Sequence, residues 1–377
     1  MSQPLTDLLV ISLEQAVAAP HLTCRMADAG ARVIKLERAD GTGDFARGYD
    51  QHAHGMSSYF VWLNRGKESL AIDIKNLDDV ALLHRLLAKA DVWVQNLAPG
   101  AMERAGLGSA TLRAKYPRLI TVDISGYGDA GPPYDEMKAY DLLVQAESGL
   151  TSITGSPEEP GRVGVSICDL TTGLNAYTAV LEALIERGIT GKGSGVKASL
   201  FASMADWLAS PLMAYEQSDV IWPRNALRHP LMCPYGAFSS NDGSRTLVAC
   251  QAEREWHRFC EHVLRDKDFA LHPKAATNII RVENRAFVEG KIEAVTSQIS
   301  RDEFHARLRK ADIAFGAVNT MPELSVHGAL RRITVGTPNG DISHPAPPVI
   351  RGEARDDYGP APAYNEHGLK IREEFSA

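Results

Sequence analysis

The feature that most constrains the fold is an alternation, over the first two hundred residues, of short apolar runs with longer helix-like segments. Each run is too short for a helix and rich in Val and Ile, which favours a β-strand. This alternation is typical of βαβ units and predicts an α/β fold with a mainly parallel sheet. The predicted strands cover residues 8–12, 32–37, 70–74, 91–96, 119–125 and 195–200.

Three of the intervening segments carry helix signals. Pro20 fits the first turn of a helix that ends near Gly30. Residues 76–90 have leucines at helical spacing behind an Asn that can cap the helix. Residues 171–188 have an apolar face and reach Gly188, a residue type common at helix ends. That face comprises Leu174, Tyr177, Leu181, Leu184 and Ile185.

The pattern changes after about residue 222. Residues 234–251 show a strand, a Gly-containing turn and a second strand, which predicts a β-hairpin. Residues 291–311 follow a helical pattern with charges on one side, and the Pro-rich tail reads as irregular. A chain of 377 residues also exceeds one ordinary core. We therefore expect a large domain over 1–221, a smaller α+β domain over 222–325, and a segment over 326–377 that returns to the large domain.

Charge and cysteine usage narrow the function classes. A formal net charge of −7 gives no overall reason to approach nucleic acid. There is neither an apolar run long enough to span a membrane nor a signal peptide pattern, so we expect a cytoplasmic protein. The five cysteines show no metal-binding spacing, so we expect neither a bound metal nor a disulfide framework.

Residues 126–131, GYGDAG, match the G-x-G-x-x-G spacing of dinucleotide-binding loops. Such a loop must open a helix whose N-terminus meets the pyrophosphate. Here Pro132 and Pro133 follow, and they favour an extended loop. We therefore expect no nicotinamide or flavin site in this segment.

Asp169 stands immediately before the helix predicted over 171–188. Asp is a favoured helix cap, so a purely structural role would explain it. A helix N-terminus also favours an ionised carboxylate, which can attack an activated acyl carbon. The residues alone leave both roles open. The adjacent Cys168 is more typical of an inert buried thiol.

Basic residues follow several predicted strands: Arg38, Lys75 and Arg104. In open α/β sheets, ligands bind outside the carboxyl ends of the strands. Cations at this edge therefore indicate a phosphate-bearing ligand, although surface Lys and Arg are common in any protein.

Seven motifs succeed one another in order: EQAVAAP (14–20), ARVIKLER (31–38), NRGKESLAIDIK (64–75), VQNLAPGAMERAGLG (94–108), ISGYGDAGP (124–132), KAYDLLVQAESG (138–149) and CDLTTG (168–173). Together they resemble the family III coenzyme A transferases, the CaiB and BaiF group, which also contains the α-methylacyl-CoA racemases. HPLMCPYGAF (229–238) is a weaker match.

The resemblance implies a Rossmann-like large domain, a small domain, and two chains interlocked as a homodimer. It also implies coenzyme A (CoA) and acyl-CoA as substrates and no tightly bound cofactor. It places the nucleophile at Asp169 in CDLTTG, which would form an aspartyl-CoA thioester that an incoming carboxylate then attacks. It places the CoA-binding positions at Arg38, Ile72, Lys75, Asn96, Leu97, Arg104 and Lys138.

Two alternatives accompany this reading. Racemases of the group carry a catalytic His where this chain has Tyr140, and Tyr is a poor proton carrier near neutrality, which favours a transferase. A CoA-binding protein without activity is the second alternative, and an intact Asp169 argues against it.

The motifs also suggest a substrate branch. ISLEQAVAAP and DFARGYD resemble the branch that handles C4 and C5 dicarboxylates such as mesaconyl, itaconyl, citramalyl and succinyl units. The chain lacks the first-loop His and the small-domain glycine run of the formyl and oxalate branch, so those substrates are not expected. Gln15, Tyr140 and Arg47 are the predicted substrate-pocket residues, with Arg47 as the cation for a second carboxylate.

Overall fold

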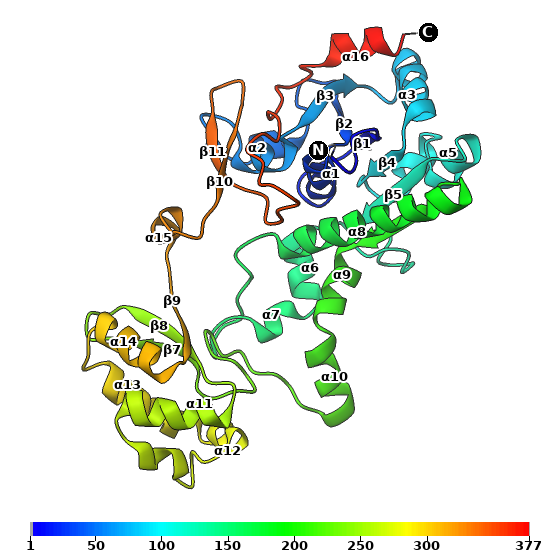
Figure 1. Ribbon diagram of the computed structural model, residues 1–377. Coiled ribbons are helices and arrows are strands. Elements are labelled where there is room, and N and C mark those ends of the chain that lie inside the picture. Colours follow the sequence, from blue (N-terminus) through cyan, green and yellow to red (C-terminus); the bar gives the residue numbers. More distant parts are fainter. Residues whose placement is uncertain (1–2, 377) are drawn as a thin grey trace. The chain divides into compact units, whose positions relative to one another are not determined.

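The computed structural model describes residues 3–376 and divides the chain into two compact units (Figure 1). Unit 1 takes in the chain up to Leu150, Arg162–Leu212, and the chain from Arg331 onward. Unit 2 comprises Thr151–Gly161 and Met213–Leu330. The division after Leu212 falls inside helix α10 (Ala209–Ser218), where no change in residue pattern marks it. We had placed the boundary between the two domains at residue 222, where the sequence changes toward a hairpin pattern, which lies beyond the observed division after Leu212.

Unit 1 is built on a six-stranded parallel sheet with the order β3-β2-β1-β4-β5-β6. All six predicted strands are present, which confirms the α/β prediction. The order reverses between β1 and β4, so the carboxyl ends of these two neighbours flank the switch point at which ligands bind in such sheets. The strands are β1 (Leu9–Leu13), β2 (Arg32–Arg38), β3 (Lys67–Ile72), β4 (Val92–Gln95), β5 (Ile120–Ser125) and β6 (Gly195–Ser199).

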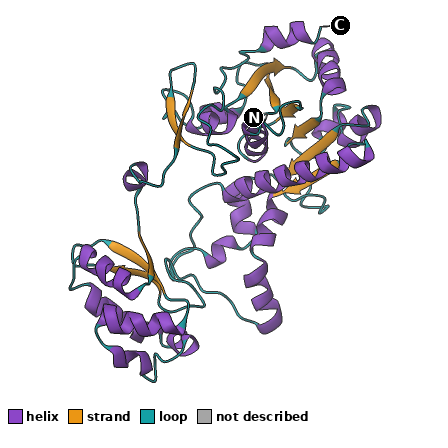
Figure 2. Cartoon of the chain, viewed as in Figure 1, coloured by secondary structure: helices purple, strands orange, loops and turns teal. Residues whose placement is uncertain are grey.

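Helices pack against the sheet of unit 1 (Figure 2). Pro20 lies in the first turn of α1, and the side chain of Asn76 caps α3, as predicted. Ile11, Leu83 and Trp93 are fully buried between strands and helices, and burial of this kind contributes about 1.5–3 kcal/mol for each large apolar side chain. The helices before residue 150 are α1 (Ala18–Asp28), α2 (Ser58–Asn64), α3 (Leu77–Lys89), α4 (Ala101–Arg104), α5 (Ser109–Lys115) and α6 (Asp141–Glu147).

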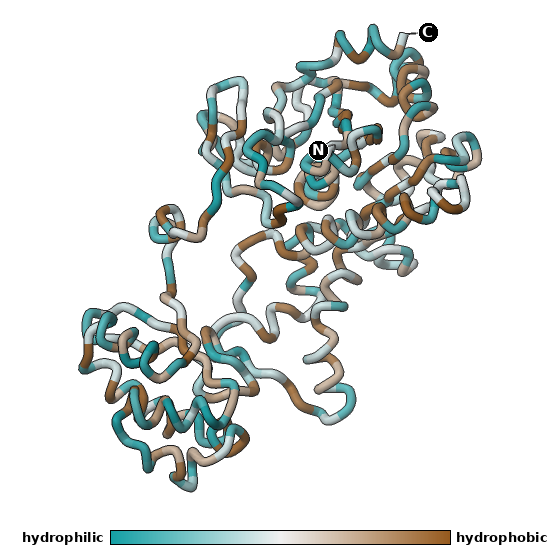
Figure 3. Tube along the Cα trace, in the orientation of Figure 1, coloured by the Kyte–Doolittle hydropathy of each residue, from teal (hydrophilic) through white to brown (hydrophobic). Residues whose placement is uncertain are grey.

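Helix α8 (Ile167–Thr190) differs from its prediction at both ends and in its packing. It begins four residues earlier, continues through Gly188, and ends at Gly191, whose φ of 73° suits the left-handed C-terminal position. Its buried face is made of small residues such as Gly173, Ala176 and Ala183. None of the five residues of the predicted apolar face is fully buried: Tyr177, Leu181 and Leu184 are half-buried, whereas Leu174 and Ile185 are exposed. The neighbouring Ile189 is 83% exposed. Figure 3 shows hydrophobic residues along this helix.

Unit 2 holds the antiparallel sheet β7-β8-β9 (Tyr235–Ser239, Arg245–Ala249, Ala314–Ala317). The first two strands form the predicted hairpin. Trp256, Phe259 and Phe304 are fully buried in its core. The helical pattern at 291–311 is split between two helices, because Ser300 caps the second one. The helices are α7 (Leu150–Ile153), α11 (Glu253–Arg258), α12 (Asn278–Glu283), α13 (Arg285–Thr296), α14 (Arg301–Ala311) and α15 (Met321–Ser325).

The tail predicted to be irregular contains a hairpin, β10–β11 (Arg332–Val335 and Ile342–Pro345), and helix α16 (Gly368–Glu374). It packs along β3, the edge strand of the six-stranded sheet. The side chain of Asn365 accepts a hydrogen bond from the Ala71 N–H at 2.8 Å, and Arg372 pairs with Asp79 at 2.7 Å. The edge of β3 is thereby covered by the C-terminal part of the chain.

Candidate active site

Asp169 is the third residue of α8, and it does not cap the helix. The N-cap residue is Ser166, whose side chain makes no capping hydrogen bond. Instead, Asp141 at the start of α6 accepts hydrogen bonds from the N–H groups of Cys168 and Asp169 through one oxygen, at 2.8 and 3.2 Å. Of the two roles that the sequence left open for Asp169, the structure therefore excludes the helix cap. The capping carboxylate comes from a residue 28 positions upstream.

The carboxylate of Asp169 is largely withdrawn from water and unpaired. Within residues 3–376, no side chain or backbone group forms a hydrogen bond or ion pair with its oxygens. Burial raises the pKa of Asp169 to about 7, and the negative charge of Asp141 adds to the shift. We expected the helix N-terminus to hold Asp169 fully ionised at neutral pH, and burial beside a second carboxylate outweighs that effect.

Asp141 is itself fixed by a fully buried glutamine. The Gln145 Nε2 donates to the second oxygen of Asp141 at 2.7 Å, and its Oε1 accepts from the Val163 N–H at 2.9 Å. Helix α6 is thus tied to the segment that leads into α8. Asp141 was not among the predicted site residues. It lies beside Tyr140 in KAYD, but only the contact across 28 residues shows its role.

Helix α1 crosses α8 one turn after Asp169. A Cβ at Gly173 would lie 2.6 Å from the Ala18 carbonyl oxygen, so only glycine permits this approach. The Nδ1 of the buried His21 lies 3.1 Å from the Leu170 carbonyl oxygen. These contacts hold the first turns of α1, which follows the loop after β1, against the first turns of α8.

Aromatic side chains approach the same place from the segment after β2. Burial raises the pKa of Tyr49 to about 12, with contributions from the charges of Asp44 and Asp169, so its hydroxyl lies within electrostatic reach of both. Its ring packs edge-on against Tyr59 at 5.6 Å between centroids. Tyr140 also interacts with Tyr49 and is 59% exposed. Tyr49, in the DFARGYD motif, is a second residue that sequence reasoning missed.

The structure joins two predicted residues at the switch point. The side-chain amide of Asn96 accepts from the Gln15 N–H at 2.9 Å and donates to the Gln15 carbonyl at 2.8 Å. The loops after β1 and β4 are thereby held together. Leu97 follows Asn96 and packs on the sheet's hydrophobic core.

The other predicted CoA-binding residues lie after neighbouring strands. Arg38 and Ile72 end β2 and β3, Lys75 lies in the following loop, and Arg104 ends the short helix after β4. Because the strands are parallel, their carboxyl ends share one edge of the sheet. Ile72 is buried, whereas Lys75, Arg104 and Lys138 are exposed. Arg38 is exposed, and its one ion pair within residues 3–376 is with its near neighbour Asp40 at 2.6 Å.

Arg47 does not present a free cation. Its guanidinium binds both oxygens of the buried Glu37, at 2.7 and 2.8 Å, and lies 3.7 Å from the centre of the Phe60 ring. A charge already matched by Glu37 has little left for a substrate carboxylate. The geometry therefore does not favour the role that we predicted for Arg47.

Arg47 belongs instead to a buried ion cluster beneath the loops after β1 and β2. Its members alternate in sign and form three pairs: Glu14 with Lys67 at 2.7 Å, Asp44 with Lys35 at 2.8 Å, and Glu37 with Arg47. Although burial opposes ionisation, the Lys67 and Lys35 ammonium groups hold the pKa of Glu14 below its usual range. The cluster is charge-balanced, which is what burial of ions requires.

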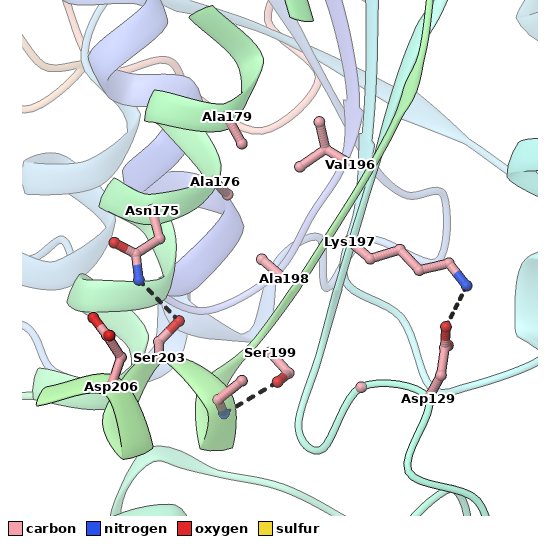
Figure 4. A pocket seen from close by; sticks show the side chains of 12 residues that line it. Asp129, Asn175, Ala176, Ala179, Val196, Lys197, Ala198, Ser199, Ser203 and Asp206 are labelled. Carbon is pink, nitrogen blue, oxygen red and sulfur yellow. Dashed lines mark hydrogen bonds and ion pairs between the residues drawn. The ribbon is translucent and has the colours of Figure 1, made fainter. Parts of the chain in front are cut away.

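Unit 1 has a hollow of about 360 Å³ between α8, α9 (Leu200–Trp207) and β6 (Figure 4). It contains the Asn175–Ser203 hydrogen bond at 3.2 Å and the exposed ion pair between Lys197 and Asp129. Alanines make up half of its remaining lining. Asp169 is not among its lining residues, so this hollow is separate from the candidate site.

Between residues 3 and 376, no helix is both long and apolar enough to cross a membrane. Over the same residues, no group of His, Cys, Asp and Glu side chains is arranged to hold a metal ion.

Similarity to known proteins agrees with the motifs. The model of CoA-transferase family III matches residues 5–368. An acetyl-CoA:oxalate CoA-transferase of Acetobacter aceti is 32% identical over 99% of this chain and 96% of its own length. A succinyl-CoA:mesaconate CoA-transferase of Haloarcula marismortui is 30% identical over 98% and 96%. The crystal structure of a CAIB/BAIF family protein from Brucella suis, 32% identical, covers all of both chains with a TM-score of 0.86. The chain therefore belongs to CoA-transferase family III.

Proposed function

We propose that Asp169 is the nucleophile of a CoA transfer from an acyl-CoA thioester to a carboxylic acid. The observation that carries the proposal is the unpaired Asp169 carboxylate at the start of α8, beside the switch-point loop. A carboxylate that makes no hydrogen bonds keeps its lone pairs for attack, and a pKa near 7 leaves a large fraction ionised at neutral pH.

The covalent steps break one thioester and form another, so that the energy of the thioester bond is retained. Asp169 attacks the donor carbonyl, the C–S bond breaks, and a mixed anhydride and CoA thiolate form. The thiolate attacks the aspartyl carbonyl, which releases the donor acid and leaves an aspartyl-CoA thioester. The acceptor carboxylate then displaces the thiolate to form a second anhydride, and the thiolate attacks its acyl carbon. A new acyl-CoA leaves and the Asp169 carboxylate is restored, with no net proton uptake.

The CoA phosphates are proposed to bind at the carboxyl edge of the sheet. Arg38, Lys75, Arg104 and Lys138 are exposed there or in the segment before α6, and none of the last three forms an ion pair within the described residues. Ile72, Asn96 and Leu97 would form the apolar and backbone part of the same surface. Cations on this edge suit a phosphate-bearing ligand better than cations scattered over helices.

The acceptor is proposed to be a dicarboxylic acid. The relatives named above act on oxalate and on mesaconate, which are both dicarboxylates, at 32% and 30% identity. The motifs had suggested C4 and C5 acids rather than oxalate. Sequence identity to these relatives does not support that preference. Because Glu37 neutralises Arg47, we assign the polar contacts with the acyl group to Gln15, Tyr49 and Tyr140.

We further propose that the enzyme works as a homodimer. The outward face of α8 exposes Leu174, Ile185 and Ile189, and apolar side chains gathered along one helix favour a protein interface. Sedimentation of the wild type should show a dimer. The double variant Ile185→Asp/Ile189→Asp should weaken it, and an unchanged dimer would exclude this face from the interface.

The nucleophile is tested by mass spectrometry of the protein after incubation with succinyl-CoA. The wild type should gain a covalent CoA adduct at Asp169, and Asp169→Ala should neither gain it nor transfer CoA to a panel of dicarboxylic acids. Asp206→Ala, a carboxylate in the separate hollow of the same unit, is the matched control. Transfer by Asp169→Ala at the wild-type rate would contradict the proposal. Solvent deuterium incorporation at the α-carbon without an acceptor acid would favour the racemase alternative.

A further inference from the structure

The residue Ala16 has an unusual backbone conformation. Its φ is +63°, in the left-handed region that residues with a Cβ rarely adopt. It follows Gln15 in the loop between β1 and α1. Asn96 fastens this loop to the end of β4, and the helix that follows it, α1, packs against α8 at Gly173. A strained residue persists only where its surroundings hold it.

The group that holds Ala16 is Asp44. One oxygen of its carboxylate accepts from the Ala16 N–H at 3.1 Å and also from the Ala46 N–H at 2.9 Å. Ala46 lies in the short 3₁₀ turn Phe45–Gly48, which leads directly to Tyr49. A single buried oxygen therefore joins the two segments that bring Gln15 and Tyr49 to the acyl pocket.

The other oxygen of Asp44 is held by the buried Lys35 ammonium at 2.8 Å. Lys35 and Asp44 are both essentially inaccessible to water. The backbone N–H of Asp44 donates to Glu37 at 2.9 Å, so the carboxylate is anchored from the main chain as well. Asp44 has no freedom to move without breaking an ion pair.

We propose that Asp44 is a positioning residue for CoA transfer, which fixes the Gln15–Val17 loop and the Phe45–Gly48 turn relative to Asp169 while Lys35 holds it in place. The proposal rests on the proposed function. If Asp44 has this role, turnover depends on the hydrogen bonds that Asp44 accepts from Ala16 and Ala46. The contribution of the Lys35–Asp44 ion pair to stability is not what turnover requires.

The charge balance of the cluster provides the test. Removing Asp44 and Lys35 together leaves two matched pairs, Glu14–Lys67 and Glu37–Arg47. Two double variants therefore separate the roles. Lys35→Met/Asp44→Leu replaces the pair by apolar side chains of similar size, which proteins commonly tolerate. Lys35→Met/Asp44→Asn also removes both charges but keeps an oxygen that can accept from Ala16 and Ala46.

We expect both double variants to fold. With Lys35→Met/Asp44→Leu, kcat for transfer should fall by about 100-fold, because a displacement of about 1 Å near the reacting groups has effects of that size. The KM for the acyl-CoA donor should change less than about threefold, because the cations proposed for CoA lie elsewhere. Lys35→Met/Asp44→Asn should stay within about tenfold of the wild-type kcat. Asp91→Asn is the matched control. Like Asp44, Asp91 accepts from a backbone N–H and pairs with a cation, but it lies at the amino end of the sheet.

Hydrogen exchange gives a readout that needs no substrate. The amides of Ala16 and Ala46 should exchange at least about tenfold faster in Lys35→Met/Asp44→Leu and remain protected in Lys35→Met/Asp44→Asn. Wild-type kcat and wild-type amide protection in the leucine variant would overturn the proposal. If the wild-type enzyme transferred CoA to no acid, the proposed function would fail, while the exchange rates would still decide whether Asp44 holds the two segments.

Discussion

The buried ion cluster and the start of α8 each hold a carboxylate within electrostatic reach of Tyr49, but the surroundings of the two carboxylates are opposite in kind. In the cluster, Asp44 binds two backbone N–H groups and an ammonium group, and Glu37 accepts from Nε and Nη2 of Arg47. At α8, the oxygens of Asp169 have no partner within residues 3–376, and the nearest charge is another carboxylate. The first arrangement stabilises the ionised form and the fold. The second leaves the ionised form costly and therefore reactive.

The largest expected effect comes from breaking the cluster. Glu14→Ala removes the partner of Lys67 and should lower the free energy of unfolding by about 3–5 kcal/mol, because it leaves an unmatched buried cation. Urea denaturation measures the change. Glu374→Ala breaks the more exposed pair with Arg32 and should cost less than about 1 kcal/mol. Equal losses in the two variants would show that burial does not distinguish these pairs.

The opposite sign is expected at Asp169. A pKa raised to about 7 in the folded state means that the folded protein binds a proton more tightly than the unfolded chain. Stability therefore falls as pH rises from about 4 to about 7. Asp169→Asn should raise the free energy of unfolding at pH 8 by about 2–4 kcal/mol, and this gain should be largely absent at pH 4. A variant that is no more stable than the wild type at pH 8 would contradict the contrast with the cluster.

Asp141→Asn sharpens the comparison by removing one charge. Asparagine can still accept from the N–H groups of Cys168 and Asp169, but it no longer repels the Asp169 carboxylate. The acid limb of the pH–rate profile for kcat/KM should move to lower pH by about half a unit to one unit. Asp141→Ala also removes the cap and should cost about 1 kcal/mol of stability. An unshifted limb in Asp141→Asn would assign the raised pKa to burial alone.

The smallest effects are expected at the exposed cations. Lys75→Ala or Lys138→Ala should raise KM for CoA substrates by about two- to fivefold with little change in kcat, and the effect should fade as salt is added. Lys192→Ala, which removes a charge just before β6 at the amino end of the sheet, is the control. Steady-state kinetics at two ionic strengths decide the matter. Equal effects at Lys192 and Lys75 would mean that the carboxyl edge has no special role.

The sequence predicts the parts of this molecule that depend on local signals. The six strands follow from their Val and Ile content, and the Asn76 cap lies beside the helix that it caps. The start of α8 is missed because its cap is Asp141, which is distant in sequence. The apolar face of α8 is visible in the periodicity, but which face becomes buried depends on what packs against it, here α1 at Gly173.

The charged residues illustrate the same limit. Arg38 and Lys75 are found at strand ends by position alone, since every parallel strand delivers its carboxyl end to one edge. Arg47 looks equally available in the sequence. However, Glu37, two residues after Lys35 on the same buried strand face, neutralises the charge of Arg47. Whether a cation is free depends on a contact between strand and loop, which no spacing rule supplies.

Gly173 fixes how closely two helices of unit 1 approach each other. Because glycine has no Cβ, the α8 backbone at Gly173 packs against the Ala18 carbonyl oxygen of α1, and a Cβ there would lie 2.6 Å from that oxygen. An alanine at this position would therefore force α1 and α8 apart. The placement of α1 against the first turns of α8 thus depends on the absence of one methyl group.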